Sequence, residues 1–166
     1  SPQAIFESLL HLGRLANPKV DDMQRQFDCH ICQPNRIALL TDSSADLPVD
    51  IMDKHQIHLL PINIHLGDHH LLDPYSIDPN RFYANIKKNL DYPTTSAPNP
   101  LQIKNKFREL SQRHQDVIMI SVAEKLSSTF ASATHIAKEF SGIRVVNSKL
   151  TSAAQSLLVY EAAELI

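Results

Sequence analysis

The chain of 166 residues suits one domain or one lobe of a larger protein, and it is long enough to bury a core without disulfides or metals. Its 16 basic and 18 acidic side chains are mixed along the sequence, and the formal net charge of -2 argues against a nucleic-acid-binding face or a polybasic membrane anchor. With two cysteines, no signal-peptide pattern and no apolar run near the roughly 18 residues of a membrane span, we expect a cytoplasmic protein.

The first 35 residues differ in pattern from the rest. Ile5, Leu9 and Leu12 follow a helical spacing, and the segment after them mixes charges with prolines. We interpret residues 1–35 as a helix and linker, the end of an upstream domain. Residues 36–166 are expected to form an α/β domain that is present only in part, because the last helix pattern stops at Ile166 without a capping signal.

Strand and helix patterns alternate regularly from residue 36 onward. Asp46 is the expected N-cap of the first of these helices, with Pro48 in its first turn. This alternation predicts a mostly parallel sheet with flanking helices, and a turn at Gly67 predicts one antiparallel hairpin. Residues 91–100 are expected to form a loop. The expected strands are 37–41, 57–66, 69–72, 116–122 and 143–147, and the expected helices are 46–56, 78–90, 101–114, 127–140 and 151–166.

Clusters of hydroxyl side chains lie at or just before the expected helix starts. Most of them directly follow a strand, so in a parallel sheet we expect those clusters to meet at one edge. Helix starts offer unpaired N–H groups and a partial positive charge, and hydroxyls add neutral donors, so together they suit a carboxylate or a phosphate. The clusters are Thr41-Asp42-Ser43-Ser44, Thr94-Thr95-Ser96, Ser127-Ser128-Thr129 and Ser148 with Thr151-Ser152.

The same residues are also the preferred N-caps of helices, a role worth about 1 kcal/mol each. Capping needs only one hydroxyl, whereas these clusters carry two or three. Ser96 is balanced between the two interpretations, because the surrounding prolines would hold its hydroxyl still for a ligand and would also start the next helix. Both roles stay open for Ser96.

Five segments in order and spacing resemble the successive motifs of the DegV family of bacterial fatty-acid-binding proteins: TDSSADLP (41–48), LPINIHLGDHHLLD (60–73), PTTSAPNP (93–100), ISVAEKLSSTFASA (120–133) and VVNSKLTSAAQSLLV (145–159). The resemblance covers residues 36–166, the N-terminal half of such a protein, and implies a DegV N-terminal domain whose second domain is missing. It further implies a non-catalytic protein that binds a long-chain fatty acid and presents it to a fatty acid kinase, related to dihydroxyacetone kinase, as a partner or as a fused upstream domain.

The resemblance also assigns roles to particular residues. The family's carboxylate-binding serine falls on Ser96, next to Thr95 in the same motif. A second carboxylate contact, usually a threonine, falls on Asn63, whose amide can still donate a hydrogen bond. The family's L-S-G-T motif brings Ser127 and Thr129 to the same site.

Several positions depart from the family pattern. Ser128 replaces a glycine of L-S-G-T, and Ala154 and Ser156 stand where the last motif normally has glycines. Added side chains there would narrow the pocket or prevent a close approach of the backbone. Asn147 replaces an aspartate and removes a charge. These changes bear on the length of acyl chain that fits.

Other functions have weaker support in the residues. His65, His69 and His70 cluster on the expected hairpin, where the four-residue separation of His65 and His69 is not that of two zinc ligands on one face of a helix, and Cys29 and Cys32 form a single C-x-x-C without further ligands. We therefore expect no metal and no cofactor. The alternative to a lipid carrier is an enzyme that acts on a small phosphorylated or carboxylated metabolite at the same sheet edge, although no general base of clear geometry stands out.

Overall fold

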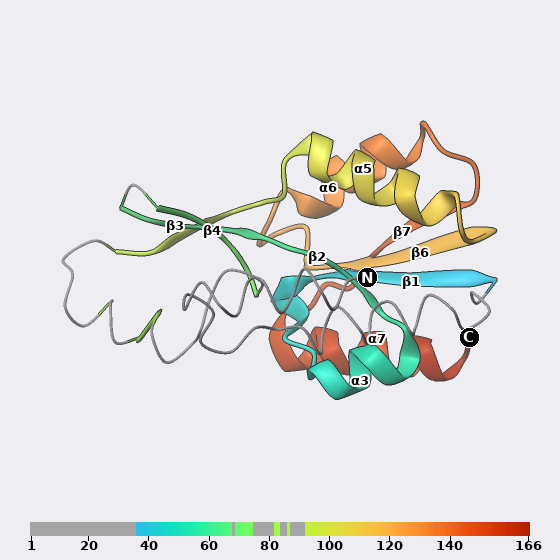
Figure 1. Ribbon diagram of the computed structural model, residues 1–166, viewed down its shortest axis with the longest axis horizontal. Coiled ribbons are helices and arrows are strands. Elements are labelled where there is room, and N and C mark those ends of the chain that lie inside the picture. The colour runs from blue at the N-terminus through green and yellow to red at the C-terminus, as the bar shows by residue number, and fades with distance from the viewer. Residues whose placement is uncertain (1–35, 68, 75–81, 84–85, 87–91) are drawn as a thin grey trace, which may run out of the picture. The chain divides into compact units, whose positions relative to one another are not determined.

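The computed structural model describes residues 36–67, 69–74, 82–83, 86 and 92–166 (Figure 1). The helix expected within residues 1–35 and the Cys29–Cys32 pair lie outside the described residues, and so does most of the helix expected over 78–90. The domain boundary at residue 36 stays a prediction.

A four-stranded parallel sheet forms the centre of the described structure. The strands run in the order β2-β1-β6-β7, and every neighbouring pair is parallel. This confirms the α/β class and the mostly parallel sheet. The chain leaves β1 toward β2 on one side and returns to β6 on the other, so the direction of strand order changes between β1 and β6. The bounds are β1 Ile37–Asp42, β2 His58–Leu60, β6 Asp116–Ser121 and β7 Ile143–Asn147.

Helices cover both faces of this sheet (Figure 1). On one face lie α5 (Pro100–Ser111) and α6 (Thr129–Ala137), and on the other lie α3 (Val49–His55) and α7 (Ser152–Glu164). A short 3-10 helix, η1 (Ser43–Ala45), follows β1. None of the described helices is both long and apolar enough to cross a membrane.

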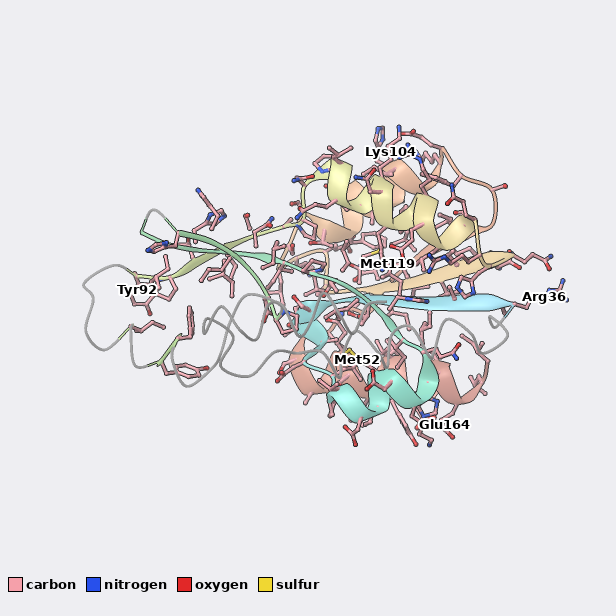
Figure 2. The ribbon with its side chains drawn as sticks, in the orientation of Figure 1. Arg36, Met52, Tyr92, Lys104, Met119 and Glu164 are labelled. Carbon is pink, nitrogen blue, oxygen red and sulfur yellow. The ribbon has the colours of Figure 1, made fainter. Side chains whose placement is uncertain are left out.

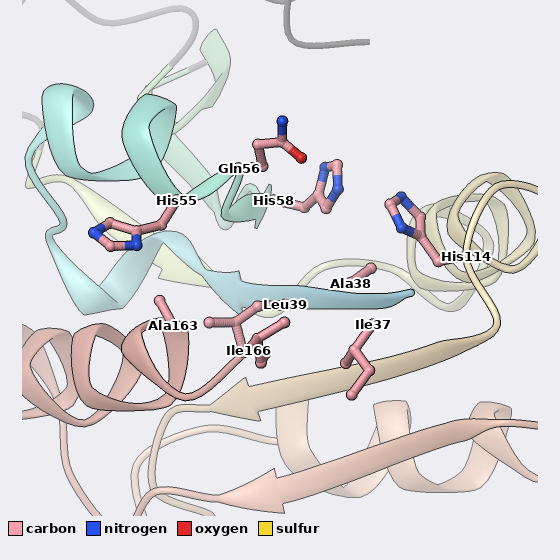
Figure 3. A pocket seen from close by; sticks show the side chains of 9 residues that line it. All are labelled: Ile37, Ala38, Leu39, His55, Gln56, His58, His114, Ala163 and Ile166. Atoms are coloured by element: carbon pink, nitrogen blue, oxygen red, sulfur yellow. The ribbon is translucent and has the colours of Figure 1, made fainter. Parts of the chain in front are cut away.

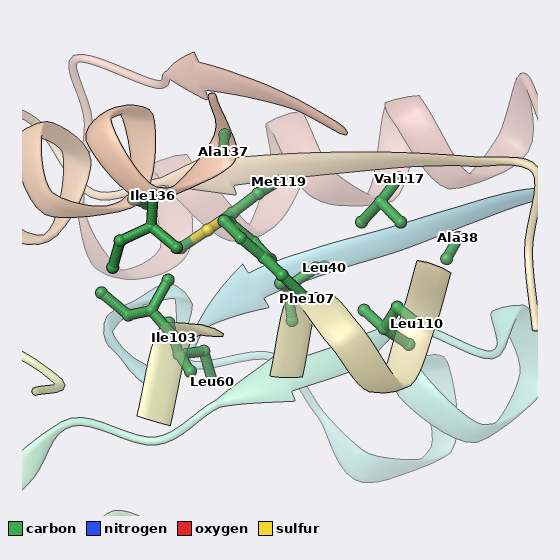
Figure 4. Packing of buried hydrophobic residues seen from close by; sticks show 11 residues of the cluster. Ala38, Leu40, Leu60, Ile103, Phe107, Leu110, Val117, Met119, Ile136 and Ala137 are labelled. Carbon is green, nitrogen blue, oxygen red and sulfur yellow. The ribbon is translucent and has the colours of Figure 1, made fainter. Parts of the chain in front are cut away.

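Alternating side chains of the strands fill two separate cores. Leu40 and Met119 pack with Phe107 of α5 in the larger core, and Leu39 and Ile120 pack on the opposite face in the smaller one. Figure 4 shows the larger core, and Figure 2 shows Met119 and Met52 on opposite sides of the sheet. The buried runs of β1 and β6 arise because a central parallel strand is covered on both faces.

A second, three-stranded antiparallel sheet has the order β4-β3-β5. It consists of β3 (Asn63–Leu66), β4 (His69–Leu72) and β5 (Thr94–Ser96). Gly67 adopts the left-handed φ of 56° in the β3–β4 turn, which confirms the predicted hairpin.

Two sequence-based expectations about this second sheet are wrong. The single strand expected over 57–66 is divided between the two sheets, with the break at Pro61-Ile62, because Pro61 has no N–H for a sheet hydrogen bond. The loop expected over 91–100 contains the strand β5, which forms because residues 94–96 pair with β3.

The expected start of α3 is also wrong. Pro48 occupies the N-cap position and Val49 begins the helix, while Asp46 adopts a left-handed conformation with φ 54° at the end of η1. A residue that precedes proline is disfavoured in the helical conformation, so Leu47 cannot continue a helix from Asp46.

Candidate functional site

The hydroxyl cluster at the C-terminal end of β1 makes its hydrogen bonds inside the protein. Asp42 is 0% exposed, and its Oδ2 accepts hydrogen bonds from the Val122 backbone N–H at 2.8 Å and from the Ser121 hydroxyl at 3.1 Å. The Ser44 hydroxyl and the Gln155 side-chain amide (3.2 Å) donate to its Oδ1. Thr41 donates to the carbonyl oxygen of Ile120 at 2.8 Å. The carboxylate therefore links β1, β6 and α7 at the place where the strand order changes direction.

This network occupies the position at which open α/β sheets commonly bind ligands. Asp42, Thr41 and Gln155 are all fully buried, and Ser121 is too. Their hydrogen-bonding groups are engaged with one another, so this cluster acts as structural support for the sheet edge. The sequence pattern did not point to Gln155, because a single glutamine in a helix belongs to no recognisable motif.

The hydroxyls of the second sheet are exposed instead. Thr94, Thr95 and Ser96 are exposed along β5, and Ser96 stands directly opposite Asn63 of β3 in the antiparallel register. Successive side chains of a strand point to opposite faces, so Ser96 and Asn63 share one face and Thr95 lies on the other. The structure thus brings together two of the predicted site residues and separates Thr95 from them.

Asn63 and Ser96 each have a defined partner. The Asn63 side-chain amide donates to the carbonyl oxygen of Ala97 at 3.0 Å, which leaves a second N–H of that amide for another acceptor. His65 Nε2 lies 2.9 Å from Ser96 Oγ, and His65 Nδ1 lies 2.7 Å from His70 Nδ1. The sequence pattern had suggested these histidines only as candidate metal ligands. The contact between His65 and Ser96 exists because residues 94–96 form a strand beside β3.

The capping role considered for Ser96 is wrong. Asn99 is the N-cap of α5, and its side chain accepts a hydrogen bond from the Gln102 N–H at 2.8 Å. The Gln102 side chain accepts one from the Asn99 N–H at 2.8 Å, which completes a capping box. The Ser96 hydroxyl is therefore not needed to start this helix.

Ser127 and Thr129 pair with each other at the start of α6. Their hydroxyl oxygens lie 2.8 Å apart, and the Thr129 N–H donates to Ser127 Oγ at 3.2 Å. Thr129 is fully buried, whereas Ser127 is partly exposed. Only Ser127 of this pair is in a position to meet a ligand.

The last cluster is also used locally. The Ser148 hydroxyl accepts from the Leu150 N–H and donates to the Leu150 carbonyl oxygen, both at 3.0 Å. Thr151, the N-cap of α7, makes no side-chain cap hydrogen bond. This cluster shapes the turn between β7 and α7.

Ser43 and Asp73 connect the two sheets. Ser43 Oγ accepts a hydrogen bond from the Ile62 N–H at 3.0 Å. Burial raises the pKa of the Asp73 carboxyl above its usual value, the hydrogen bond with Ser43 opposes that rise, and the charge of Asp46 adds to it. The connection between the sheets thus contains a carboxyl that is less easily ionised than an exposed one.

A small hollow lies at the N-terminal end of β1, the end away from Asp42 (Figure 3). Its cavity volume of about 10 Å³ gives room for about one water molecule, so it cannot hold an acyl chain. Within the described residues, no group of three or more His, Cys, Asp or Glu side chains could hold a metal ion. The hollow is lined by Ile37, Ala38, Leu39, His55, Gln56, His58, His114, Ala163 and Ile166.

Comparisons with known proteins agree with this architecture. A family model described as "Uncharacterised protein, DegV family" matches residues 36–166. Protein DegV of Bacillus subtilis is 32% identical over 132 residues, which cover 78% of this chain and 47% of that protein. The chain thus spans about half the length of the curated relatives it matches.

Solved structures with the same fold are described as fatty-acid-binding proteins. The crystal structure of DegV from Bacillus subtilis, described as a fatty acid binding protein, has a TM-score of 0.74 and 31% identity, over 78% of this chain and 47% of that one. A DegV family protein from Thermus thermophilus, described by its fatty acid binding, has a TM-score of 0.72 and 31% identity, over the same shares.

Proposed function

The chain belongs to the DegV family, and from this premise we propose that it holds the carboxylate of a long-chain fatty acid at Ser96 and Asn63. The observation that carries the proposal is the pairing of these two residues across β3 and β5. Both side chains lie on one face, and Ser96 is exposed and free of a capping role. The solved relatives described as fatty-acid-binding proteins support the class of ligand.

A carboxylate suits these donors chemically. The Ser96 hydroxyl and the second N–H of the Asn63 amide are neutral donors, and hydrogen bonds to a charged acceptor contribute about 1.5–3 kcal/mol. Burying an acyl chain contributes about 0.8 kcal/mol per methylene, so the tail supplies most of the affinity and the polar pair sets the orientation. Ser127, the reachable member of the pair at α6, is a further candidate contact for the head group.

The resemblance to the DegV family also implies a protein partner for the lipid-loaded protein. We propose that the full-length natural protein presents its fatty acid to a fatty acid kinase of the dihydroxyacetone-kinase type. Purified kinase, ATP and the lipid-loaded protein should together yield an acyl phosphate detectable by mass spectrometry. A kinase that phosphorylates free fatty acid equally well without the protein would contradict the presenting role.

Native mass spectrometry of the full-length natural protein, purified from a bacterial host, tests lipid binding directly. A retained mass that matches a C14–C18 fatty acid is the expected result. Retention of polar metabolites alone would exclude the lipid carrier and favour the alternative of a metabolite enzyme.

Substitutions on β5 test the proposed head-group site. Ser96→Ala should weaken palmitate binding by roughly 1–2 kcal/mol, because a charged carboxylate loses one donor. Thr95→Ala is the matched control, since Thr95 is adjacent on the same strand, is also exposed and lies on the opposite face. Equal losses from the two substitutions would contradict the assignment of the site to the Ser96 face.

Asn63 offers a test by rescue. Asn63→Leu removes the donor and should weaken palmitate binding, whereas Asn63→Thr restores a donor of the kind that the family usually has at this position. A threonine variant as weak as the leucine variant would argue against a hydrogen bond from this position to the carboxylate.

A further inference from the structure

His65 stands between His70 and Ser96 on the second sheet. Its Nδ1 lies 2.7 Å from His70 Nδ1, and its Nε2 lies 2.9 Å from Ser96 Oγ. Both separations are those of hydrogen bonds. The two imidazole rings are nearly perpendicular, at 85°, with centroids 4.9 Å apart, as expected when their nitrogens point at each other.

The register of the sheet explains this line of three side chains. His65 is directly opposite His70 in the β3–β4 pair, and Asn63, two residues before His65, is directly opposite Ser96 in the β3–β5 pair. Ser96 is therefore the diagonal neighbour of His65, within reach of a long side chain on the same face. The line runs from His70 through His65 to Ser96, which is proposed to bind the carboxylate together with Asn63.

Proton positions along this line depend on one another. Two Nδ1 atoms in hydrogen-bond contact share one proton, so one ring donates and the other accepts. If His70 donates to His65 Nδ1, a neutral His65 carries its proton on Nε2 and donates to Ser96 Oγ. Ser96 then accepts from His65 and keeps its own hydroxyl proton for an outside acceptor. In the reverse arrangement Ser96 donates to His65 and has no proton left for a carboxylate.

We propose that His65, held in its Nε2–H form by His70, is a positioning residue that directs the Ser96 hydroxyl proton toward the bound carboxylate. The proposal rests on the proposed function, because only an anionic head group selects this direction of the hydrogen bonds. Among the described residues, the face of β4 and β5 that carries His70 and Ser96 has no Asp, Glu, Lys or Arg that would reverse the direction of these hydrogen bonds. His70 is the titratable neighbour of His65 on this face, and the hydroxyls of Thr94 and Ser96 do not ionise near neutral pH.

A double-mutant cycle in the full-length natural protein tests this coupling, with palmitate binding measured by displacement of a fluorescent fatty acid. His65→Leu should weaken binding about 3- to 10-fold in the wild-type background. In the Ser96→Ala background the same substitution should have no further effect, because His65 acts through the hydroxyl that has been removed. Independent, multiplying losses would overturn the proposal.

Conservative variants separate positioning from packing. His65→Gln carries an amide nitrogen at the reach of Nε2 and should restore most of the affinity lost in His65→Leu. His70→Asn, which keeps a donor at the reach of Nδ1, should likewise bind better than His70→Leu. Thermal unfolding of each variant checks that the hairpin still folds, and a glutamine variant that folds normally but binds as weakly as the leucine variant would contradict the role.

Nitrogen-15 NMR of the imidazoles gives a readout that packing alone does not change. With palmitate bound, His65 should show a protonated Nε2 and an unprotonated Nδ1. A His65 ring protonated on Nδ1 alone in the palmitate complex would overturn the inference and leave the fatty-acid site intact. If the wild-type protein binds no palmitate while it is folded, the proposed function itself fails, which distinguishes the two failures.

Discussion

Two hydroxyl clusters that look alike in the sequence have opposite surroundings in the structure. Thr41-Asp42-Ser43-Ser44 covers the end of the central strand β1 and the start of η1, where Asp42 is buried and accepts hydrogen bonds from β6 and α7. Thr94-Thr95-Ser96 lies on the edge strand β5 of the smaller sheet, with all three residues exposed. The hydrogen bonds of the first cluster hold β1, β6 and α7 together, whereas the side chains of the second cluster are open to solvent. Position in the sheet, more than residue type, therefore decides which cluster supports the fold.

The largest effect on stability is expected from removal of the buried Asp42 carboxylate. Asp42→Ala should lower the free energy of unfolding by about 3 kcal/mol or more, because the Val122 N–H, the Ser121 hydroxyl and the Gln155 amide lose their acceptor in a buried site. Urea-induced unfolding of the full-length protein measures the change. A loss below about 1 kcal/mol would show that the network contributes little to stability.

The N-cap of α5 provides an intermediate effect close to the proposed site. Asn99→Ala should cost about 1 kcal/mol, because it removes the acceptor for the Gln102 N–H and half of the capping box. Asn99→Ser, which retains a capping oxygen, is the matched control. The midpoint of thermal unfolding distinguishes them, and equal midpoints for the two variants would mean that the cap bond is dispensable.

The stability that the connection between the two sheets contributes, at Ser43 and Asp73, should depend on pH. Because burial raises the pKa of Asp73, its protonated form suits the folded state, and the stability it contributes is present at acid pH and lost as pH rises through the raised pKa. Asp73→Asn stays neutral and still accepts from Ser43, so it should be more stable than wild type at neutral pH. This advantage should disappear below the usual pKa of an aspartate. Urea midpoints across pH measure it, and a constant difference would contradict the burial effect.

The smallest expected effect on stability belongs to the proposed ligand residue. Ser96→Ala should change the free energy of unfolding of the lipid-free protein by less than about 0.5 kcal/mol, because an exposed hydroxyl on an edge strand supports little of the fold. Urea unfolding checks this in parallel with Asp42→Ala. A loss comparable to that of Asp42→Ala would remove the distinction between the two clusters.

Much of the main domain was predictable from local pattern. The central strands β1 and β6 read as continuous apolar runs, and the helices α5 and α6 carry an apolar face, so local pattern predicts them. The edge strand β7 and the helix α7 also lie close to their expected positions. The second sheet was not predictable in the same way. β5 has only three residues, in a segment bounded by Pro93 and Pro98, so no period can be recognised, and it is a strand because it pairs with β3.

The candidate site was predictable in its residues but not in their arrangement. Ser96 and Asn63 were identified through the family motifs, and the structure pairs them on one face. Thr95 was grouped with Ser96 because a loop has no fixed alternation, whereas a strand turns successive side chains to opposite faces. The diagonal contact between His65 and Ser96 was likewise not predictable, because it exists only when residues 94–96 form a strand.

The family, the α/β class and the order of the hydroxyl-bearing segments could be predicted from the sequence, because they depend on residues near one another in the chain. Which hydroxyls are buried and which are exposed depends on the tertiary fold. Apart from Ser44, two positions along the chain, the donors to Asp42 lie 79 to 113 positions away, in Ser121, Val122 and Gln155. The residues around Asp42 in the sequence do not indicate such distant partners. A hydroxyl that is buried with its hydrogen bonds satisfied supports the fold, and one that is exposed can bind a ligand.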